Sequence, residues 1–152
     1  MKWTKRWLMV EVGHVHTDLS HAQLTALARN LEVDIRDPNS KHRNQSIWCL
    51  RRMAKMPHRV EEAVPVLAIG LSDPDPENFH AALELFERAE IAADYTDDLV
   101  NAFRTQQDKG VRWHLAECLS KLIRVRPAFE PTLRELIALE RDPDVKDGLM
   151  GK

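Results

Sequence analysis

The sequence predicts an all-α protein whose helices pair and stack as a right-handed α–α superhelix, and three observations support this prediction. An aspartate that marks a turn or a helix start recurs at a nearly constant interval. Apolar residues between these aspartates follow helical spacing. The 152-residue chain has only five glycines and 6% aromatic residues, whereas β-sandwiches and barrels need more of both.

The recurring aspartates divide the chain into repeats, because Asp followed closely by Pro or Gly is typical of a turn before a helix. They are Asp37, Asp73, Asp108 and Asp142, and the three intervals between them are nearly equal. We therefore expect one α-helical repeat domain over 1–152, with three helix pairs between two capping segments. The expected bounds are 1–36 for an N-terminal cap, 37–72, 73–107 and 108–141 for the repeats, and 142–152 for a frayed partial repeat.

Each repeat is expected to hold two amphipathic helices, and a further helix is expected in the N-terminal cap along Leu24, Leu27, Ala28 and Leu31. Helix pairs of this size cannot bury their apolar stripes alone, so neighbouring pairs must stack. The first-helix stripes are Ser46, Cys49, Leu50 and Met53; Phe79, Ala82, Leu83 and Phe86; and Leu115, Cys118, Leu119 and Leu122. The second-helix stripes are Val64, Leu67, Ala68 and Leu71; Leu99, Ala102 and Phe103; and Leu133, Leu136 and Ile137.

Two junctions resemble the HEAT-repeat family. Residues 62–76 hold a helix with an internal proline and then the turn LSDPDP, and residues 139–146 (LERDPDVK) look similar. The family places a Val-Arg pair after this turn; Val111-Arg112 matches it, Val145-Lys146 nearly matches it, and Glu77-Asn78 departs from it. The resemblance covers about residues 37–152. It implies a short α-solenoid, a class that usually works by binding a partner, although fold alone does not set function.

Composition and charge limit the other classes. The formal net charge of −2 gives no global attraction to nucleic acid or to an anionic membrane. No apolar run approaches the length of a membrane span, since Glu11 interrupts the run that begins at Trp7. The two cysteines lack metal-type spacing and favour a reducing compartment. We expect a cytoplasmic protein without a membrane partner.

Charge alternates along the chain. Residues 38–60 contain six Lys or Arg and no acid, 73–98 contain nine acids and one arginine, and 104–126 are again mainly basic. A continuous phosphate track would need basic charge in every repeat. The acidic middle repeat instead favours a protein partner with basic charge, although solvated helix faces explain the same pattern equally well.

The candidate binding residues are exposed aromatic and charged positions on the predicted helices, with the inner surface of the second helices around Glu61, Arg104 and Arg134 as the expected contact surface. Packing at a repeat junction is the alternative role for each tryptophan. The full set is Trp48, Arg51, Arg52, Arg59, Glu84, Glu87, Arg104, Trp113 and Arg134.

Two clusters suggest chemistry, each with a structural alternative. His14 and His16, with His21 nearby, have spacing that could ligate zinc, but a polar loop before a helix explains them as well. Cys118 with His114 could form a nucleophilic pair. Because Cys49 occupies the equivalent repeat position, a buried apolar role is favoured for both cysteines. No catalytic residue and no cofactor is predicted.

The sequence therefore predicts a non-catalytic protein-binding module that acts as an adaptor, regulator or inhibitor. The alternative is a nucleic-acid-binding protein related to the HEAT-like DNA glycosylases, which would use the basic repeats with Trp48 or Trp113. A catalytic aspartate of those enzymes cannot be aligned to this sequence. A third interpretation, a HEAT-like lyase that attaches tetrapyrroles, is supported by the repeat alone.

Overall fold

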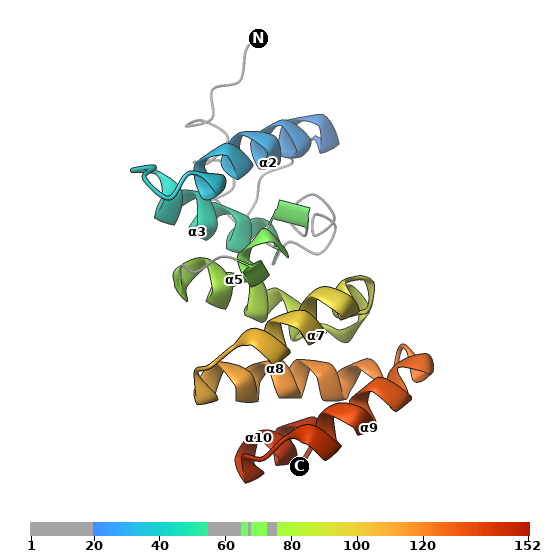
Figure 1. Cartoon of the computed structure of the whole chain (residues 1–152). Helices are drawn as coiled ribbons and strands as arrows, with labels where there is room; N and C mark the ends of the chain where they lie inside the picture. The colour runs from blue at the N-terminus through green and yellow to red at the C-terminus, as the bar shows by residue number, and fades with distance from the viewer. Residues whose placement is uncertain (1–19, 55–64, 67, 73–75) are drawn as a thin grey trace. The chain divides into compact units, whose positions relative to one another are not determined.

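The computed structural model describes residues 20–54, 65–66, 68–72 and 76–152, which are mainly helical (Figure 1). None of these residues lies in a β-strand, and the all-α prediction is confirmed. The chain divides into two compact units, Met1–Ala82 and Leu83–Lys152.

The two units contain the following helices. The first unit contains α2 (His21–Arg36), α3 (Arg43–Ala54), the 3-10 helix η1 (Ala68–Ser72) and the start of α5 (Pro76–Phe86). The second unit contains the end of α5, then α6 (Ala89–Ala92), η2 (Ala93–Tyr95), α7 (Thr96–Thr105), α8 (Lys109–Leu122), η3 (Pro127–Phe129), α9 (Glu130–Leu139) and α10 (Pro143–Leu149).

In the first unit, α2 and α3 pack against each other. The helix α2 starts with a capping box. The side chains of Ser20 and Gln23 each accept a hydrogen bond from the backbone N–H of the other residue. A part-buried polar link joins α2 to α3, because the Asp34 carboxylate accepts hydrogen bonds from Ser40 Oγ in the connecting turn at 3.2 Å and from Ser46 Oγ of α3 at 2.9 Å. Ser46 is fully buried, and this bond satisfies its hydroxyl.

Except for Ala68, which is half-buried, the predicted stripe residues of the first unit are buried wherever the structure describes their side chains. These residues are Leu27, Ala28 and Leu31 in α2, Ser46, Cys49 and Leu50 in α3, Phe79 and Ala82 in α5, and Leu71 in η1. The second helix of the first repeat differs from the prediction, since residues 68–72 form a 3-10 helix. Residues 1–19 and 55–64, which include Arg59, Glu61 and Val64, and also Leu67 lie outside the described residues.

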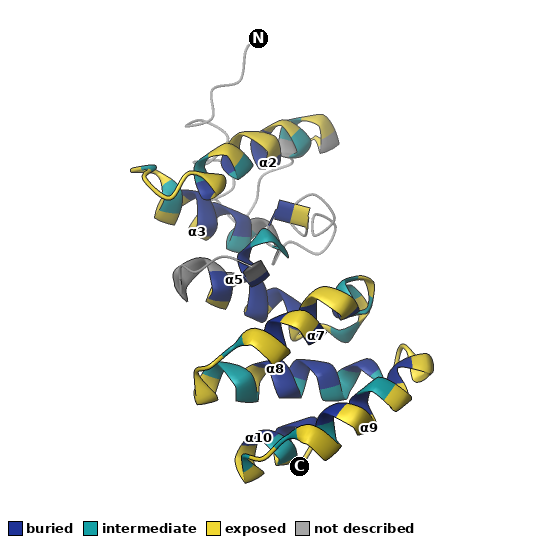
Figure 2. Cartoon of the chain, viewed as in Figure 1, coloured by how far each residue is buried: buried dark blue, intermediate teal, exposed yellow. Residues whose placement is uncertain are grey.

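In the second unit, α8 contacts α6, α7 and α10, and α10 also contacts α9 (Figure 1). These helices bury their apolar residues against one another and form the core of the unit; Figure 2 marks the buried residues in dark blue. This core includes the predicted stripe residues Leu99, Ala102 and Phe103 of α7, Leu115, Cys118, Leu119 and Leu122 of α8, and Leu133 and Leu136 of α9. Residues 94–97 are helical, because α6 and η2 lead directly into α7.

Two turns in the second unit, one repeat apart, have the same hydrogen bonds. Gln106 Oε1 accepts the N–H groups of the next two residues at 2.9 and 3.0 Å, and Glu140 Oε1 does the same at 2.9 Å for both. The next helix then begins with an aspartate N-cap, Asp108 for α8 and Asp142 for α10. The predicted helix starts at these two aspartates are therefore confirmed.

Arg112 connects these two turns. Its Nη1 donates to the carbonyls of Phe103 at 2.9 Å and Gln106 at 3.2 Å, where α7 ends. Its guanidinium carbon lies 4.4 Å from the centre of the Phe103 ring. Its Nη2 forms an ion pair with the carboxylate of Glu140, whose side chain is only 6% exposed. The arginine of the Val-Arg pair is thus a structural residue in this unit.

The C-terminal segment is an ordered helix, not the frayed end that the sequence predicts. Lys109 Nζ lies 3.1 Å from an Asp142 carboxylate oxygen and 2.6 Å from one of Asp144, and these bonds raise the pKa of Lys109. Gly148 allows α10 to approach α8 closely, since a Cβ there would lie 3.2 Å from the Cβ of Ala116. The second glycine, Gly151, follows α10 with a φ of +69°.

We expect Arg112→Met to lower the free energy of unfolding by about 2 kcal/mol, because the mostly buried Glu140 carboxylate and two carbonyls lose their donor. Urea denaturation measures this change. Arg104→Met is the matched control, since Arg104 and its ion-pair partner Glu135 are 52% and 58% exposed. Its expected effect is below about 0.5 kcal/mol. Equal effects of the two substitutions would contradict the role given to Arg112.

The turn at 140–142 also predicts how stability depends on pH. Burial alone would raise the pKa of Glu140, but the N–H of Asp142 and the Arg112 guanidinium outweigh burial and lower the pKa from 4.5. As pH falls, Glu140 therefore becomes protonated in the unfolded chain before it does in the folded chain. The stability that ionised Glu140 contributes is lost as pH falls below about 4.5. We expect wild type to lose more stability than Glu140→Gln between pH 5 and pH 3 (roughly the range of carboxyl titration) in urea denaturation. Parallel curves would refute this assignment.

Candidate functional site

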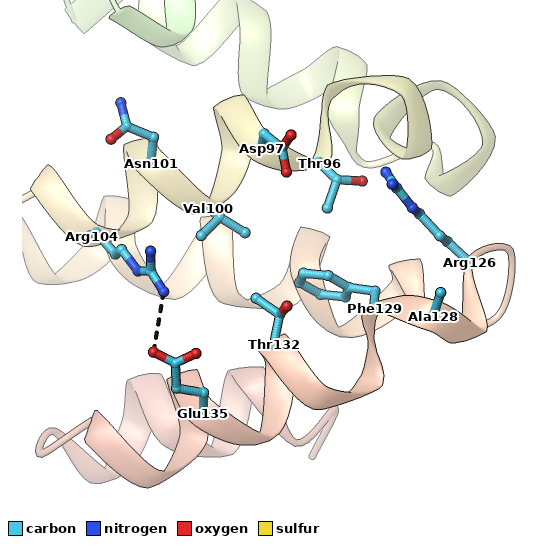
Figure 3. Close-up of a pocket in the computed structure, with 10 residues that line it drawn as sticks. All are labelled: Thr96, Asp97, Val100, Asn101, Arg104, Arg126, Ala128, Phe129, Thr132 and Glu135. Carbon is cyan, nitrogen blue, oxygen red and sulfur yellow. Dashed lines mark hydrogen bonds and ion pairs between the residues drawn. The ribbon is translucent and has the colours of Figure 1, made fainter.

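A groove of ≈ 400 Å³ lies between α7 and α9, the second helices of two successive predicted repeats (Figure 3). It lies wholly within the second unit. Its lining combines charged, polar and apolar side chains: Thr96, Asp97, Val100, Asn101, Arg104, Arg126, Ala128, Phe129, Thr132 and Glu135. Such a mixture suits the recognition of a polar or charged chain segment.

Helical spacing places the polar groups on the α7 wall. Asp97, Asn101 and Arg104 stand three or four residues apart and so share one face, while Leu99 and Phe103 point into the core. The apolar floor comes from Val100 and Phe129, which are 8% and 4% exposed. The core stripe of α7 therefore determines which of its side chains line the groove.

Charged side chains lie at both ends of the groove. At one end, Arg104 Nη2 lies 3.4 Å from Glu135 Oε1, which links α7 to α9 (Figure 3). At the other end, Arg126 Nη1 donates to the Ala93 carbonyl at 3.1 Å. An exposed pair such as Arg104–Glu135 contributes little to stability, so both groups can exchange this contact for one with a ligand.

The segment that leads into the α7 wall is strongly acidic. Five exposed carboxylates form no ion pair with any residue of 83–152, and they raise the local negative potential. They are Glu87, Glu90, Asp94, Asp97 and Asp98. Burial raises the pKa of Tyr95, and the nearby carboxylates of Asp94 and Asp98 raise it further. We name these five acidic residues the acidic segment.

On α3, the structure brings two of the predicted binding residues together. Trp48 is 50% exposed, and the guanidinium carbon of Arg52 lies 5.4 Å from the centre of its ring. Arg51 stands on the same helix and is half-buried. The predicted residue Arg59 lies outside the described residues.

The predicted binding residues of the second unit do not form one cluster. Arg104 lines the groove, while Arg134 pairs with Glu130 at 2.6 Å and does not line it. Glu84 and Glu87 are exposed. Trp113 is half-buried, and a Cβ placed on Gly148 would lie 3.4 Å from its ring, so Trp113 packs where α8 meets α10.

The cysteines have the burial expected of apolar core positions. Burial raises the pKa of the Cys118 thiol to about 12, an effect that the nearby Lys121 only partly offsets. A thiol with this pKa stays protonated at neutral pH and is a poor nucleophile. Cys49 is fully buried as well, and the His114 ring contacts the Trp113 ring at a centroid distance of 5.4 Å.

The predicted zinc ligands His14 and His16 lie outside the described residues, as does the side chain of His21. Within the part of the chain that the structure describes, no three His, Cys, Asp or Glu side chains are placed to hold a metal ion. In the same part, no helix has the length and hydropathy needed to cross a lipid bilayer.

Comparison of the chain with protein-family models, with curated proteins and with solved structures gives no match. The candidate site is therefore assigned from its geometry and chemistry alone.

Sequence reasoning missed most of the groove residues. It identified Arg104 but not Asp97, Asn101, Thr132 or Glu135. The i, i+3 and i+4 spacing of polar residues on each second helix is a readable signal for a common face. Which polar face borders a groove depends on the packing of α7 beside α9, and no local pattern encodes that packing.

We expect both thiols to resist modification in the folded protein. In a Cys49→Ala variant, the native Cys118 should react with an aromatic disulfide reagent at pH 8 at least about 100-fold more slowly than in urea, because it is buried and protonated. Absorbance of the released thiolate measures the rate. A rate similar to that of the unfolded chain would show an accessible, reactive Cys118.

Proposed function

We propose that this chain is a HEAT-type helical-repeat module that binds a protein partner and does not itself catalyse a reaction. In this proposal the repeats 37–72, 73–107 and 108–141 stack as a right-handed superhelix. The equivalent turns at 106–108 and 140–142 support it, because they show one helix–turn–helix arrangement used twice at the interval of the repeat.

The observation that carries the proposal is the groove between α7 and α9. Its apolar floor and polar rim resemble the composition of protein interfaces, where a buried centre is surrounded by hydrogen-bonding groups. The acidic segment adjoins its α7 wall, and the five carboxylates of this segment attract a basic surface and increase its association rate. We therefore propose that the partner presents a basic segment to this groove.

The proposal is tested by capture of proteins from the source-cell lysate on the immobilised chain. Asp97→Arg and Thr132→Arg place a cation and extra bulk in the groove. Asp147→Arg and Ala138→Arg are the matched controls, since both are exposed outside it. We expect one dominant protein that the control variants retain and that each groove variant retains at least about tenfold less.

Salt provides the second readout, because attraction between exposed charges is screened within about 10 Å at 0.1 M ionic strength. The amount of captured protein should fall as salt rises. Retention that is independent of salt and equal in groove and control variants would exclude the α7–α9 groove as the contact surface.

Nucleic-acid binding is the second candidate function, and the exposed Trp48 with Arg52 beside its ring favours it. An aromatic ring and an adjacent cation are the groups that hold an unstacked base and its phosphate. The same capture experiment distinguishes the two functions. Nuclease-sensitive nucleic acid without an enriched protein, lost in Trp48→Ala, would establish the second candidate.

A further inference from the structure

A second groove borders α9 on its other side. It has a volume of ≈ 420 Å³ and lies between the end of α8, α9 and the end of α10. The first groove uses Thr132 and Glu135 of α9, whereas the second uses Leu133 and Ile137. Since successive residues of a helix are rotated by about 100°, these two pairs lie on opposite faces of α9.

The floor of this second groove is apolar. Leu133 and Leu149 lie at its base and are 4% and 1% exposed, while Ile123 and Ile137 are half-buried. Met150 stands on its rim and is 38% exposed. A flexible thioether on the rim of an apolar groove adapts readily to the side chains of a docked chain.

The rim is positively charged. Arg134 is neutralised by its ion pair with Glu130 at 2.6 Å. Lys121 and Arg124 also line the groove, and neither forms an ion pair with any residue of 83–152. The groove therefore combines an apolar floor with the charges of Lys121 and Arg124, a combination that complements an apolar stripe flanked by carboxylates.

The repeat indicates that the occupant is a helix. At the interval that separates Asp108 from Asp142, Glu130 and Arg134 of α9 correspond to Thr96 and Val100 of α7. On α7, these positions line the groove in which α9 forms the opposite wall. On α9, the corresponding positions line the second groove. At the same interval, the floor residues Leu133 and Ile137 correspond to Leu99 and Phe103, which are buried in the core of the unit, where α7 packs against α8. This face of α9 is thus equivalent to a face of α7 that faces the helical core.

We propose that the groove between α9 and the ends of α8 and α10 binds an acidic amphipathic helix of a partner protein. Apolar residues at i, i+3, i+4 and i+7 would occupy the floor formed by Leu133 and Ile137, as in other helix-in-groove complexes. Carboxylates beside that stripe would pair with Lys121 and Arg124. This site is separate from the α7–α9 groove and does not depend on the function proposed for it.

Fluorescence anisotropy with a synthetic helix tests the proposal on the full chain. The probe is a labelled peptide of about 18 residues, a length that can hold a helix, with leucines at the four stripe positions and glutamates elsewhere. Its counterpart has lysines in place of the glutamates. We expect the acidic peptide to bind at least about tenfold more tightly than the basic one, since two cations face it.

Charge reversal separates this groove from general charge attraction. The double variant Lys121→Glu with Arg124→Glu should weaken binding of the acidic peptide at least about tenfold. Arg88→Glu with Arg141→Glu changes the net charge equally at exposed positions outside the groove and should leave binding unchanged. Circular dichroism shows whether each variant is folded, and the neutral pair Lys121→Gln with Arg124→Gln provides a milder replacement.

Four results would overturn the proposal. Three of them concern the peptides: no binding of the acidic peptide, equal binding of both peptides, or equal weakening by the two charge-reversal variants. A fourth is self-association of the chain that Met150→Glu abolishes, observed by sedimentation without peptide binding. That result would assign the groove to a second copy of this chain. Thr132→Arg, which fills only the other groove, should leave peptide binding unchanged.

Discussion

The ion pair between Arg112 and Glu140, with the bonds that each group makes to the backbone, is the interaction on which the C-terminal unit depends. Arg112 reaches the end of α7, nine residues away at Phe103, and the start of α10, 28 residues away at Glu140. Glu140 in turn holds the two amides that precede α10. One arginine therefore sets the positions of the helices on both sides of α8, and these helices form the boundaries of the two grooves.

The helices and their buried faces could be predicted because they depend on local patterns. The stripe Leu115, Cys118, Leu119 and Leu122 predicts both α8 and its burial, and Asp108 and Asp142 predict where helices start. The C-terminal helix was not predicted. Two glycines there suggest fraying, but Gly148 instead allows a close approach of α10 to α8, and only the packed structure shows that neighbour.

The candidate site could be predicted only in part, for a physical reason. Arg104 stands out as an exposed cation on a second helix, but whether such a residue lines a groove depends on the side chains that lie opposite it. Its partner Glu135 is 31 residues away and belongs to another repeat. Trp113 shows the reverse case: a large aromatic residue on a first helix suggests a contact for a partner, yet its ring packs against α10. Exposure and pairing come from tertiary packing, which helical spacing does not report.

The position of α9 between two grooves has a thermodynamic consequence. Each groove uses a different face of one ten-residue helix, so a ligand in either groove would restrict the motion of the same backbone. If the first ligand restricts the motion of α9, the second ligand loses less entropy when it binds. Two ligands that touch no common side chain would then favour each other's binding, each by the same factor. In this way a short helical chain can act as a coincidence detector for two proteins rather than as a passive scaffold for one.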